Sequence, residues 1–204
     1  MNKIEILLFD IGGVLVELGG MGTMLDWIDH RYNAEEVMEV WLKSPSVRKF
    51  ETGKSNPDEF AAEIIKEFSL PVETGKFLKE FKLWPTQTFE GAIELLSSLR
   101  KRYQLISLSN SNEVHWPRVM DDLGLEKYFD HHFPSHVTGQ MKPEHQAFLQ
   151  IAESTNTPPE RILFFDDSPT NIGVAKELGF NAIRVLGVND ITAVLKESGL
   201  MDVA

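Results

Sequence analysis

The sequence contains no cysteine, and this absence excludes three kinds of chemistry. Without thiols the chain has no disulfide framework, no thiolate zinc site and no cysteine nucleophile. A basic cluster is also missing: 20 Lys and Arg stand against 31 Asp and Glu, which gives a net charge of −11. We therefore expect neither a nucleic acid nor a membrane as a partner.

Long apolar runs are missing as well, since no stretch approaches the roughly 18 apolar residues of a membrane span. The start of the chain carries Glu5 and Asp10 and no small-residue cleavage site, so it does not resemble a signal peptide. These absences favour a soluble, cytoplasmic protein. With 204 residues and 42% hydrophobic composition, the chain suits one sizeable domain, or a core that carries an inserted subdomain.

Short apolar runs that end in polar residues are what the sequence does contain. The run that leads to Asp10 (IEILLFD) is typical of a strand buried on both faces of a parallel sheet. Similar runs occur at residues 103–110, 161–167 and 181–186, with helical patterns between them. This alternation predicts an α/β fold with a doubly wound, Rossmann-like parallel sheet.

The segment after the first strand has a different, helical pattern. Asn33 and Asn56 each begin a capping box followed by an amphipathic helix, and no convincing strand pattern occurs between residues 23 and 81. Residues 44–55 are interpreted as a loop between these helices and a candidate lid. We therefore predict a core formed by residues 1–16 and 86–204, with an all-helical cap inserted at residues 17–85.

Three of the predicted strands end in polar side chains, which a parallel sheet would bring to one edge. These strand ends are Asp10, Ser109-Asn110 and Asp166-Asp167. Gly12 and Gly13 allow a sharp turn and a close approach of main-chain N–H groups to an anion. Each feature alone has an ordinary structural explanation, such as a strand-end cap or, for Lys142 in the GQMKPE turn, a solvated surface lysine.

Four segments, FDIGGVL, LSNSN, MKPE and FFDDSPTN, resemble in order and spacing the four motifs of the haloacid dehalogenase superfamily. The shape of these motifs looks closest to a bacterial branch that includes glucose-1-phosphate phosphatases, and the helical segment lies where the superfamily inserts its cap. The resemblance implies a Mg²⁺-dependent phosphomonoester hydrolase. Such an enzyme acts through an aspartyl-phosphate on a small phosphorylated metabolite, for example a sugar-1-phosphate.

The resemblance also assigns roles to individual residues. Asp10 is implied as the nucleophile, with Ser109 and Lys142 as further catalytic residues that contact the phosphoryl group. The implied Mg²⁺ ligands are Asp10, the backbone carbonyl of Gly12, Asp167 and Asp166, with Asn171 orienting Asp167 or binding the metal through water. The implied substrate-binding residues are Gly12, Gly13, Ser109, Asn110, Lys142 and, in the cap, Arg48.

The chain departs from the superfamily pattern at Gly12. Most of the phosphatases carry a second aspartate there, which protonates the leaving oxygen and later activates water. Because acid–base assistance is worth ~10²–10⁴-fold, the enzyme must use water, a cap residue or a substrate whose leaving group departs easily. We hypothesise leaving groups of low pKa, such as those of sugar-1-phosphates, and a long-lived phosphorylated Asp10. His136 and His145, which flank Lys142, are further candidates for the proton donor.

Two other functions stay open from the sequence. Gly12 favours a non-catalytic module that binds phosphorylated ligands or a protein, although such a module has no need of Asp10. A metal-independent haloacid dehalogenase would use the same nucleophile to attack carbon, but would leave the pair Asp166-Asp167 unexplained. The sequence carries no prediction of oligomeric state.

Overall fold

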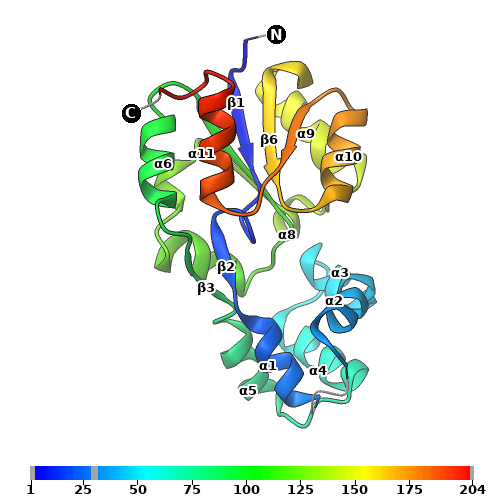
Figure 1. Ribbon diagram of the computed structural model, residues 1–204. Helices are drawn as coiled ribbons and strands as arrows, with labels where there is room; N and C mark the ends of the chain where they lie inside the picture. The colour runs from blue at the N-terminus through cyan, green and yellow to red at the C-terminus, as the bar shows by residue number, and fades with distance from the viewer. Residues whose placement is uncertain (1–2, 29–31, 203–204) are drawn as a thin grey trace.

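The computed structural model describes residues 3–28 and 32–202, so the outermost residues of the predicted core and residues 29–31 of the predicted cap lie outside it. The described chain forms two lobes (Figure 1). One lobe contains a five-stranded parallel sheet, and the other contains helices α1 to α5. The predicted α/β class with a doubly wound parallel sheet is confirmed.

The sheet has the strand order β5-β4-β1-β6-β7. Its strands are β1 (Ile6–Phe9), β4 (Gln104–Ser109), β5 (His131–Pro134), β6 (Ile162–Asp166) and β7 (Asn181–Arg184). The helices of this lobe are α6 (Ala92–Leu99), α7 (His115–Pro117), α8 (Ser135–Thr138), α9 (His145–Thr155), α10 (Pro169–Glu177) and α11 (Val188–Glu197). A π-helical segment (Arg118–Asp122) and two 3₁₀ turns (Glu126–Tyr128 and Pro159–Arg161) complete it.

The position of β1 at the centre of the sheet explains why its sequence is apolar throughout. Leu7 and Phe9 belong to the hydrophobic cluster formed with α6 and α11. Ile6 and Leu8 belong to the cluster on the other face, formed with α9 and α10. Because successive side chains of a strand point to opposite faces, a strand covered on both sides presents no side chain to solvent. Burial of each such side chain contributes roughly 1.5–3 kcal/mol.

The register of the sheet brings the polar strand ends together. Phe9 of β1 lies opposite Ser107 of β4 and Phe165 of β6. The next residue, Asp10, donates its backbone N–H to the carbonyl of Phe165. Asp10, Ser109 and Asp166 therefore reach the same carboxyl edge of the sheet, which is where open α/β folds bind ligands.

The second lobe is held together by an aromatic cluster. Its helices are α1 (Gly20–Trp27), α2 (Ala34–Lys43), α3 (Pro45–Glu51), α4 (Pro57–Phe68) and α5 (Thr74–Phe81). The rings of Phe50 and Phe60 stack at 4.2 Å, and Phe81 and Trp41 pack against the same cluster. The capping boxes at Asn33 and Asn56 are both present, as predicted. In the described part of the chain, no helix combines the length and apolar character needed to cross a membrane.

The interpretation of residues 44–55 as a loop is wrong, because this segment contains helix α3. The Ser44 side chain accepts the N–H of Val47, and Pro45 occupies the first turn. Val47 and Phe50 are buried in the aromatic cluster. The Ser-Pro pair therefore begins a helix as well as ending the previous one.

Several short elements have no pattern that predicts them from the sequence, among them helix α8. Helix α1 lies in a glycine-rich stretch without a helical pattern, and β5 is a short edge strand. The strands β2 (Val16–Leu18) and β3 (Pro85–Thr88) pair antiparallel and join the two lobes. Both predicted boundaries of the cap, 16/17 and 85/86, fall within this strand pair.

Candidate active site

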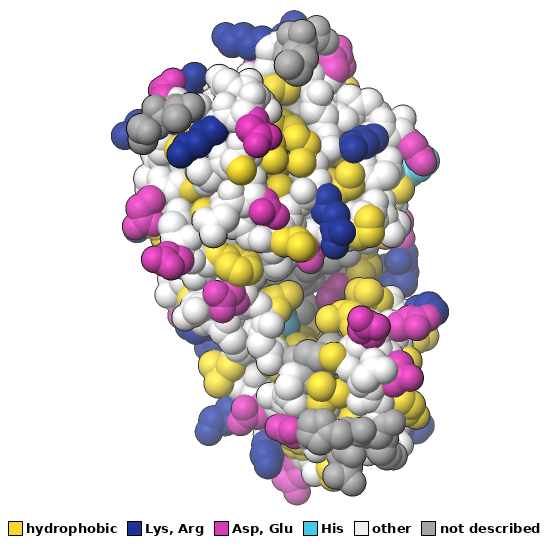
Figure 2. Space-filling view, viewed as in Figure 1, with side chains coloured by type: hydrophobic (Ala, Val, Ile, Leu, Met, Phe, Trp, Pro, Cys, Tyr) yellow, Lys and Arg dark blue, Asp and Glu magenta, His cyan; other side chains and the backbone are white. Residues whose placement is uncertain are grey.

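A cavity of about 750 Å³ lies between the carboxyl edge of the sheet and the helical lobe. Figure 2 shows the surface hollowed between the two lobes. The wall formed by the sheet lobe carries polar groups, among them Asp10, Ser109 and Asp167. The opposite wall is mostly apolar and includes Trp41 and Trp84. This volume and this division between polar and apolar walls are typical of small-molecule sites.

Three carboxylates meet at the floor of the cavity. Asp10 follows β1 directly, Asp166 is the last residue of β6, and Asp167 comes next. One oxygen from each lies within 4.8 Å of one oxygen from the other two. Since three negative charges at this separation repel one another, the cluster needs positive charge.

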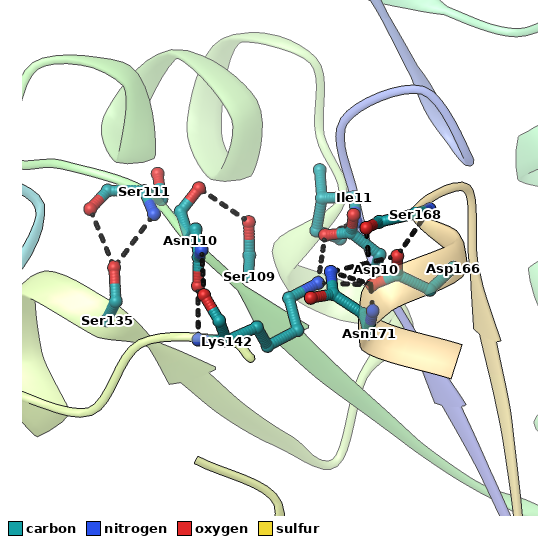
Figure 3. A network of polar contacts seen from close by, with 10 residues as sticks. All are labelled: Asp10, Ile11, Ser109, Asn110, Ser111, Ser135, Lys142, Asp166, Ser168 and Asn171. Atoms are coloured by element: carbon teal, nitrogen blue, oxygen red, sulfur yellow. Dashed lines mark hydrogen bonds and ion pairs between the residues drawn. The ribbon is translucent and has the colours of Figure 1, made fainter. Parts of the chain in front are cut away.

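Lys142 supplies part of that charge. Its Nζ lies 2.9 Å from Asp10 Oδ1 and 2.6 Å from Asp166 Oδ2 (Figure 3). The side chain is only 2% exposed, so these ion pairs are shielded from solvent. The surface location that the sequence left open for Lys142 does not apply.

The loop that carries Lys142 is fixed by Asn110. The Asn110 side chain donates to the Lys142 carbonyl at 2.9 Å and accepts the Lys142 N–H at 2.8 Å. This pair of hydrogen bonds resembles one rung of a sheet ladder and holds the lysine backbone beside β4. Asn110 thus braces the Lys142 loop, and Ser109 lies next to it in the cavity wall with its hydroxyl 3.4 Å from the Asn110 carbonyl.

Asp166 is the most constrained of the three carboxylates. It is fully buried, and its Oδ1 accepts the Ser168 N–H at 2.8 Å. The Asn171 amide donates to both carboxylate oxygens, at 3.0 and 3.1 Å. Since Lys142 takes the remaining direction at Oδ2, Asp166 is arranged to hold Lys142 and Asn171 in place. Asp10 and Asp167, which line the cavity, are the carboxylates that face it.

The two glycines after Asp10 differ in their surroundings. Gly13 has a φ of +74°, and a Cβ there would lie 2.6 Å from Asp167 Oδ2. Its N–H is donated to the Val16 carbonyl, so Gly13 provides space for Asp167 and no free N–H donor for a substrate. Gly12 lines the cavity, and a Cβ there would lie 2.9 Å from Leu18 Cδ1.

The electrostatics of the site follow from burial and crowding. Burial raises the pKa of Asp10 to about 7 against the opposing charge of Lys142, and the neighbouring carboxylates add to the rise. Burial and the charge of Asp166 also raise the pKa of Asp167. Burial alone would lower the pKa of Lys142, but the charges and hydrogen bonds of Asp10 and Asp166 outweigh it and raise the pKa.

This donor set suits a divalent cation. Three carboxylates and one ammonium group leave an excess of two negative charges when all are ionised. The available donors are oxygens, which Mg²⁺ prefers. Asp10 and Asp167 would hold such an ion from the side of the cavity, close to the backbone of Gly12. The roles of Asp10, Gly12, Asp166 and Asp167 as ligands stay predictions.

The predicted contacts outside this cluster are arranged differently. Arg48, on α3, lines the cavity but forms an ion pair with Glu144 of the other lobe. Its role as a substrate contact stays a prediction. His136 and His145 do not belong to the residues that line the cavity. The prediction that one of them supplies a proton therefore finds no support in the geometry.

Two titratable residues in the cavity wall were not selected from the sequence. Glu51 ends α3 and lines the cavity from the helical lobe. His115 stands at the start of α7 and lines the cavity from the sheet lobe. Neither belongs to a recognisable motif, and only the folding of one lobe onto the other brings Glu51 to the site.

The chain is similar to known enzymes along most of its length. It is 26% identical over 195 residues to a D-ribitol-5-phosphate phosphatase from Bacteroides thetaiotaomicron, covering 89% of this chain and 91% of the relative. A crystal structure of a haloacid dehalogenase family enzyme from that organism, in complex with magnesium and inorganic phosphate, superposes with a TM-score of 0.76 at 26% identity. The superposition covers 89% of this chain and 94% of the related chain.

A more distant structure shares the fold alone. An L-2-haloacid dehalogenase from Xanthobacter autotrophicus superposes with a TM-score of 0.64 at 18% identity, covering 98% of this chain and 84% of its own. The model of the haloacid dehalogenase-like hydrolases matches residues 4–179, which include every strand of the sheet except β7. The chain therefore belongs to the haloacid dehalogenase-like hydrolase family.

Proposed function

We propose that the protein is a Mg²⁺-dependent phosphomonoester hydrolase that acts through a phosphorylated Asp10. The observation that carries this proposal is the cluster of Asp10, Asp166 and Asp167 with Lys142 bonded to two of them. The excess negative charge of the cluster favours a bound cation, and a cation is what two anions, a carboxylate and a phosphate, need in order to approach each other. The related enzyme that holds magnesium and inorganic phosphate supports the same chemistry.

Each residue of the cluster has a defined task in this mechanism. The Asp10 carboxylate attacks phosphorus, which divides one difficult displacement into two easier ones. Lys142 stabilises the negative charge on the phosphoryl oxygens and favours the ionised form of Asp10 against the effect of burial. The Ser109 hydroxyl, in the cavity wall, donates to a phosphoryl oxygen. Bound Mg²⁺ would supply charge neutralisation at the same oxygens.

The shape of the cavity favours a small phosphorylated metabolite as the substrate. The phosphate would lie on the polar floor, and the carbon skeleton would lie against the apolar wall of Trp41 and Trp84. Indole rings of this kind pack well against the C–H faces of sugars and polyols. Carbohydrate phosphates are therefore the first class to test. A preference for sugar-1-phosphates is expected only if no other side chain replaces the acid missing at Gly12.

Hydrolysis of p-nitrophenyl phosphate tests the proposal. We expect phosphate release that requires Mg²⁺, stops with EDTA and is abolished by Asp10→Asn, which removes the nucleophilic charge at nearly constant shape. Glu153→Gln, on the outer part of α9, is a matched surface control and should keep full activity. Activity that survives EDTA or Asp10→Asn would contradict the proposal.

The dehalogenase alternative is less consistent with this site. The fold is shared with an L-2-haloacid dehalogenase, so the fold does not choose between the two reactions. Asp167 favours the phosphatase reaction, because it places a further carboxylate beside Asp10. Without a cation, this carboxylate would only raise the pKa of the nucleophile. Chloride release from a 2-haloacid without added metal would favour the alternative.

A further inference from the structure

The proposed hydrolase lacks a side chain at Gly12, so its leaving oxygen needs a proton from elsewhere. The candidates are the titratable groups that share the cavity with Asp10. In the described part of the chain these are Arg48, Glu51, His115, Lys142 and Asp167. A donor must be free of competing hydrogen bonds, must face the nucleophile and must be protonated near neutral pH.

His115 fails this test although it lies in the cavity wall. Its Nε2 bonds to the Phe81 carbonyl at 2.7 Å, and its Nδ1 bonds to the Asn112 side chain at 3.2 Å. Both ring nitrogens are therefore occupied. Burial lowers the pKa of His115 to about 4, so the ring is neutral at physiological pH.

Lys142, Arg48 and Asp167 are also excluded as proton donors, because each already has other partners. Lys142 is bonded to Asp10 and Asp166, and Arg48 forms its ion pair with Glu144. Asp167 is part of the carboxylate cluster that would hold the cation. A carboxylate that binds a cation is not a proton donor.

Glu51 meets the requirements. It lies at the last position of α3, one turn after Arg48, and both side chains line the cavity, while Val47 and Phe50 are buried in the lobe. Among the described residues, none forms a hydrogen bond or ion pair with the Glu51 side chain. Gly53, two residues later, packs against the His136 carbonyl of the other lobe, which fixes the end of α3 against the sheet lobe.

The surroundings of Glu51 favour its protonated form. Burial raises the pKa of Glu51 to about 7, the charge of Asp10 adds to the rise, and Lys142 opposes it. The C-terminal end of a helix carries partial negative charge, which acts in the same direction. A carboxyl group whose pKa lies near the working pH can both donate and accept a proton.

We propose that Glu51 is the general acid and base of this enzyme, supplied by the cap in place of the residue missing at Gly12. This inference rests on the proposed phosphatase function. As the Asp10 oxygen bonds to phosphorus, the bond from phosphorus to the leaving oxygen breaks, and the Glu51 proton passes to that oxygen to give an alcohol. The Glu51 carboxylate then takes a proton from a water whose oxygen bonds to phosphorus. The bond from phosphorus to the Asp10 oxygen breaks, which releases inorganic phosphate and regenerates the Asp10 carboxylate and the protonated Glu51.

A series of substituted phenyl phosphates tests this role, because no member carries a hydroxyl group that Glu51 could merely bind. For Glu51→Gln, kcat/KM should fall by about 10² or more with phenyl phosphate, whose leaving group is basic. It should fall by less than about threefold with p-nitrophenyl phosphate, whose leaving group needs little help. The dependence on leaving-group pKa thus becomes steeper in the variant.

The control is Glu63→Gln, which changes another cap carboxylate, one paired with Lys49 outside the cavity. This variant should behave as wild type across the whole series. Glu51→Gln should also raise the phosphorylated fraction of the protein during turnover of p-nitrophenyl phosphate, measured as intact mass after an acid quench, because the attacking water then lacks its base.

The outcomes separate this inference from the proposed function. An active wild type in which Glu51→Gln lowers kcat/KM equally for all phenyl phosphates, or leaves all of them unchanged, would overturn the inference alone. An unchanged phosphorylated fraction would overturn the base role. A wild type that hydrolyses none of the series would overturn the proposed function, and the inference with it.

Discussion

Gly12 and Gly13 are adjacent, but the structure restricts them very differently. Gly13 has a left-handed backbone, and an added Cβ would collide with the Asp167 carboxylate. At Gly12 the contact is with the end of Leu18, a flexible side chain that is 60% exposed and free to turn away. The two positions therefore form a matched pair for substitution by alanine.

We predict that Gly13→Ala lowers the free energy of unfolding by about 1–2 kcal/mol, because alanine is strained in the left-handed region. It should also weaken Mg²⁺ binding, because Asp167 is displaced. Gly12→Ala should cost less than about 1 kcal/mol and leave Mg²⁺ binding unchanged. Urea unfolding measures the stability of each variant, and Mg²⁺ titration measures its affinity for the ion. Equal Mg²⁺ affinity in the two variants would show that Asp167 does not depend on Gly13.

At this scale the sequence predicted which polar residues lie together at the strand ends, but not which of them contact one another. Asp10, Lys142 and Asp167 were selected because they end buried strands or fall in ordered motifs, and the structure brings them together. Glu51 was not selected, because a single acid among surface-like residues carries no pattern. Its significance depends on a contact between lobes that no local rule describes.

At the scale of the helix, Ser44 decides whether α3 begins where it does. Its hydroxyl accepts the Val47 N–H and donates to Glu67 at 2.8 Å. We predict that Ser44→Ala lowers the free energy of unfolding by about 1 kcal/mol, the usual value of an N-cap. It should also speed amide hydrogen exchange in residues 46–51, the part of α3 that carries backbone N–H groups.

Asn33→Ala is the control for this prediction, because it removes the corresponding cap of α2. A similar loss of stability is expected, but without faster amide exchange in residues 46–51. If both variants exchanged alike in α3, the effect would belong to the lobe as a whole and not to the cap of that helix.

Elements were predictable where the pattern was long or capped. Buried strands such as β1 and β6, and helices such as α4, have either a continuous apolar run or a capping box. The strands β2 and β3 contain 3 and 4 residues and pair across a long separation in the chain, so local periodicity carries no signal for them. Helix α3 has no capping box, and its Ser44-Pro45 start reads equally well as the beginning of a loop.

At the scale of the whole molecule, stability should depend on pH through Asp10. Its pKa is raised from 3.8 to about 7, so the folded state holds a proton that the unfolded state has lost. The contribution of Asp10 to stability therefore falls as the pH rises from about 4 to 7 in the ion-free protein. A cation that binds the ionised carboxylate reverses this loss.

We predict that Mg²⁺ binds more than about tenfold more weakly at pH 5.5 than at pH 8, because protons compete for Asp10. Isothermal titration at the two pH values measures the ratio. Asp10→Asn should bind Mg²⁺ more weakly at both pH values, and its two affinities should differ much less than those of the wild type. A wild-type affinity that is independent of pH would mean that Asp10 is already ionised in the absence of the metal.

The contact between the lobes can be tested at Gly53. Its φ is +70°, and an added Cβ would lie 2.2 Å from the His136 carbonyl. We predict that Gly53→Ala moves α3 away from α8 and raises KM for p-nitrophenyl phosphate severalfold, with a larger radius of gyration in solution scattering. Gly75→Ala, in α5, meets no heavy atom within 4 Å and should change neither. A Gly53 variant with both values unchanged would contradict the contact.

The way the lobes are joined has a consequence for turnover. The two chain crossings, β2 and β3, lie side by side, while α3 lies across the lobe from them and against α8 (Figure 1). If the helical lobe rotates about the β2–β3 pair, the side of the lobe that is furthest from this pair moves most. Glu51, at the end of α3, lies on that side. Each opening that admits substrate or releases product would then also move the proposed proton donor away from phosphorus. The open form would therefore not catalyse the reaction.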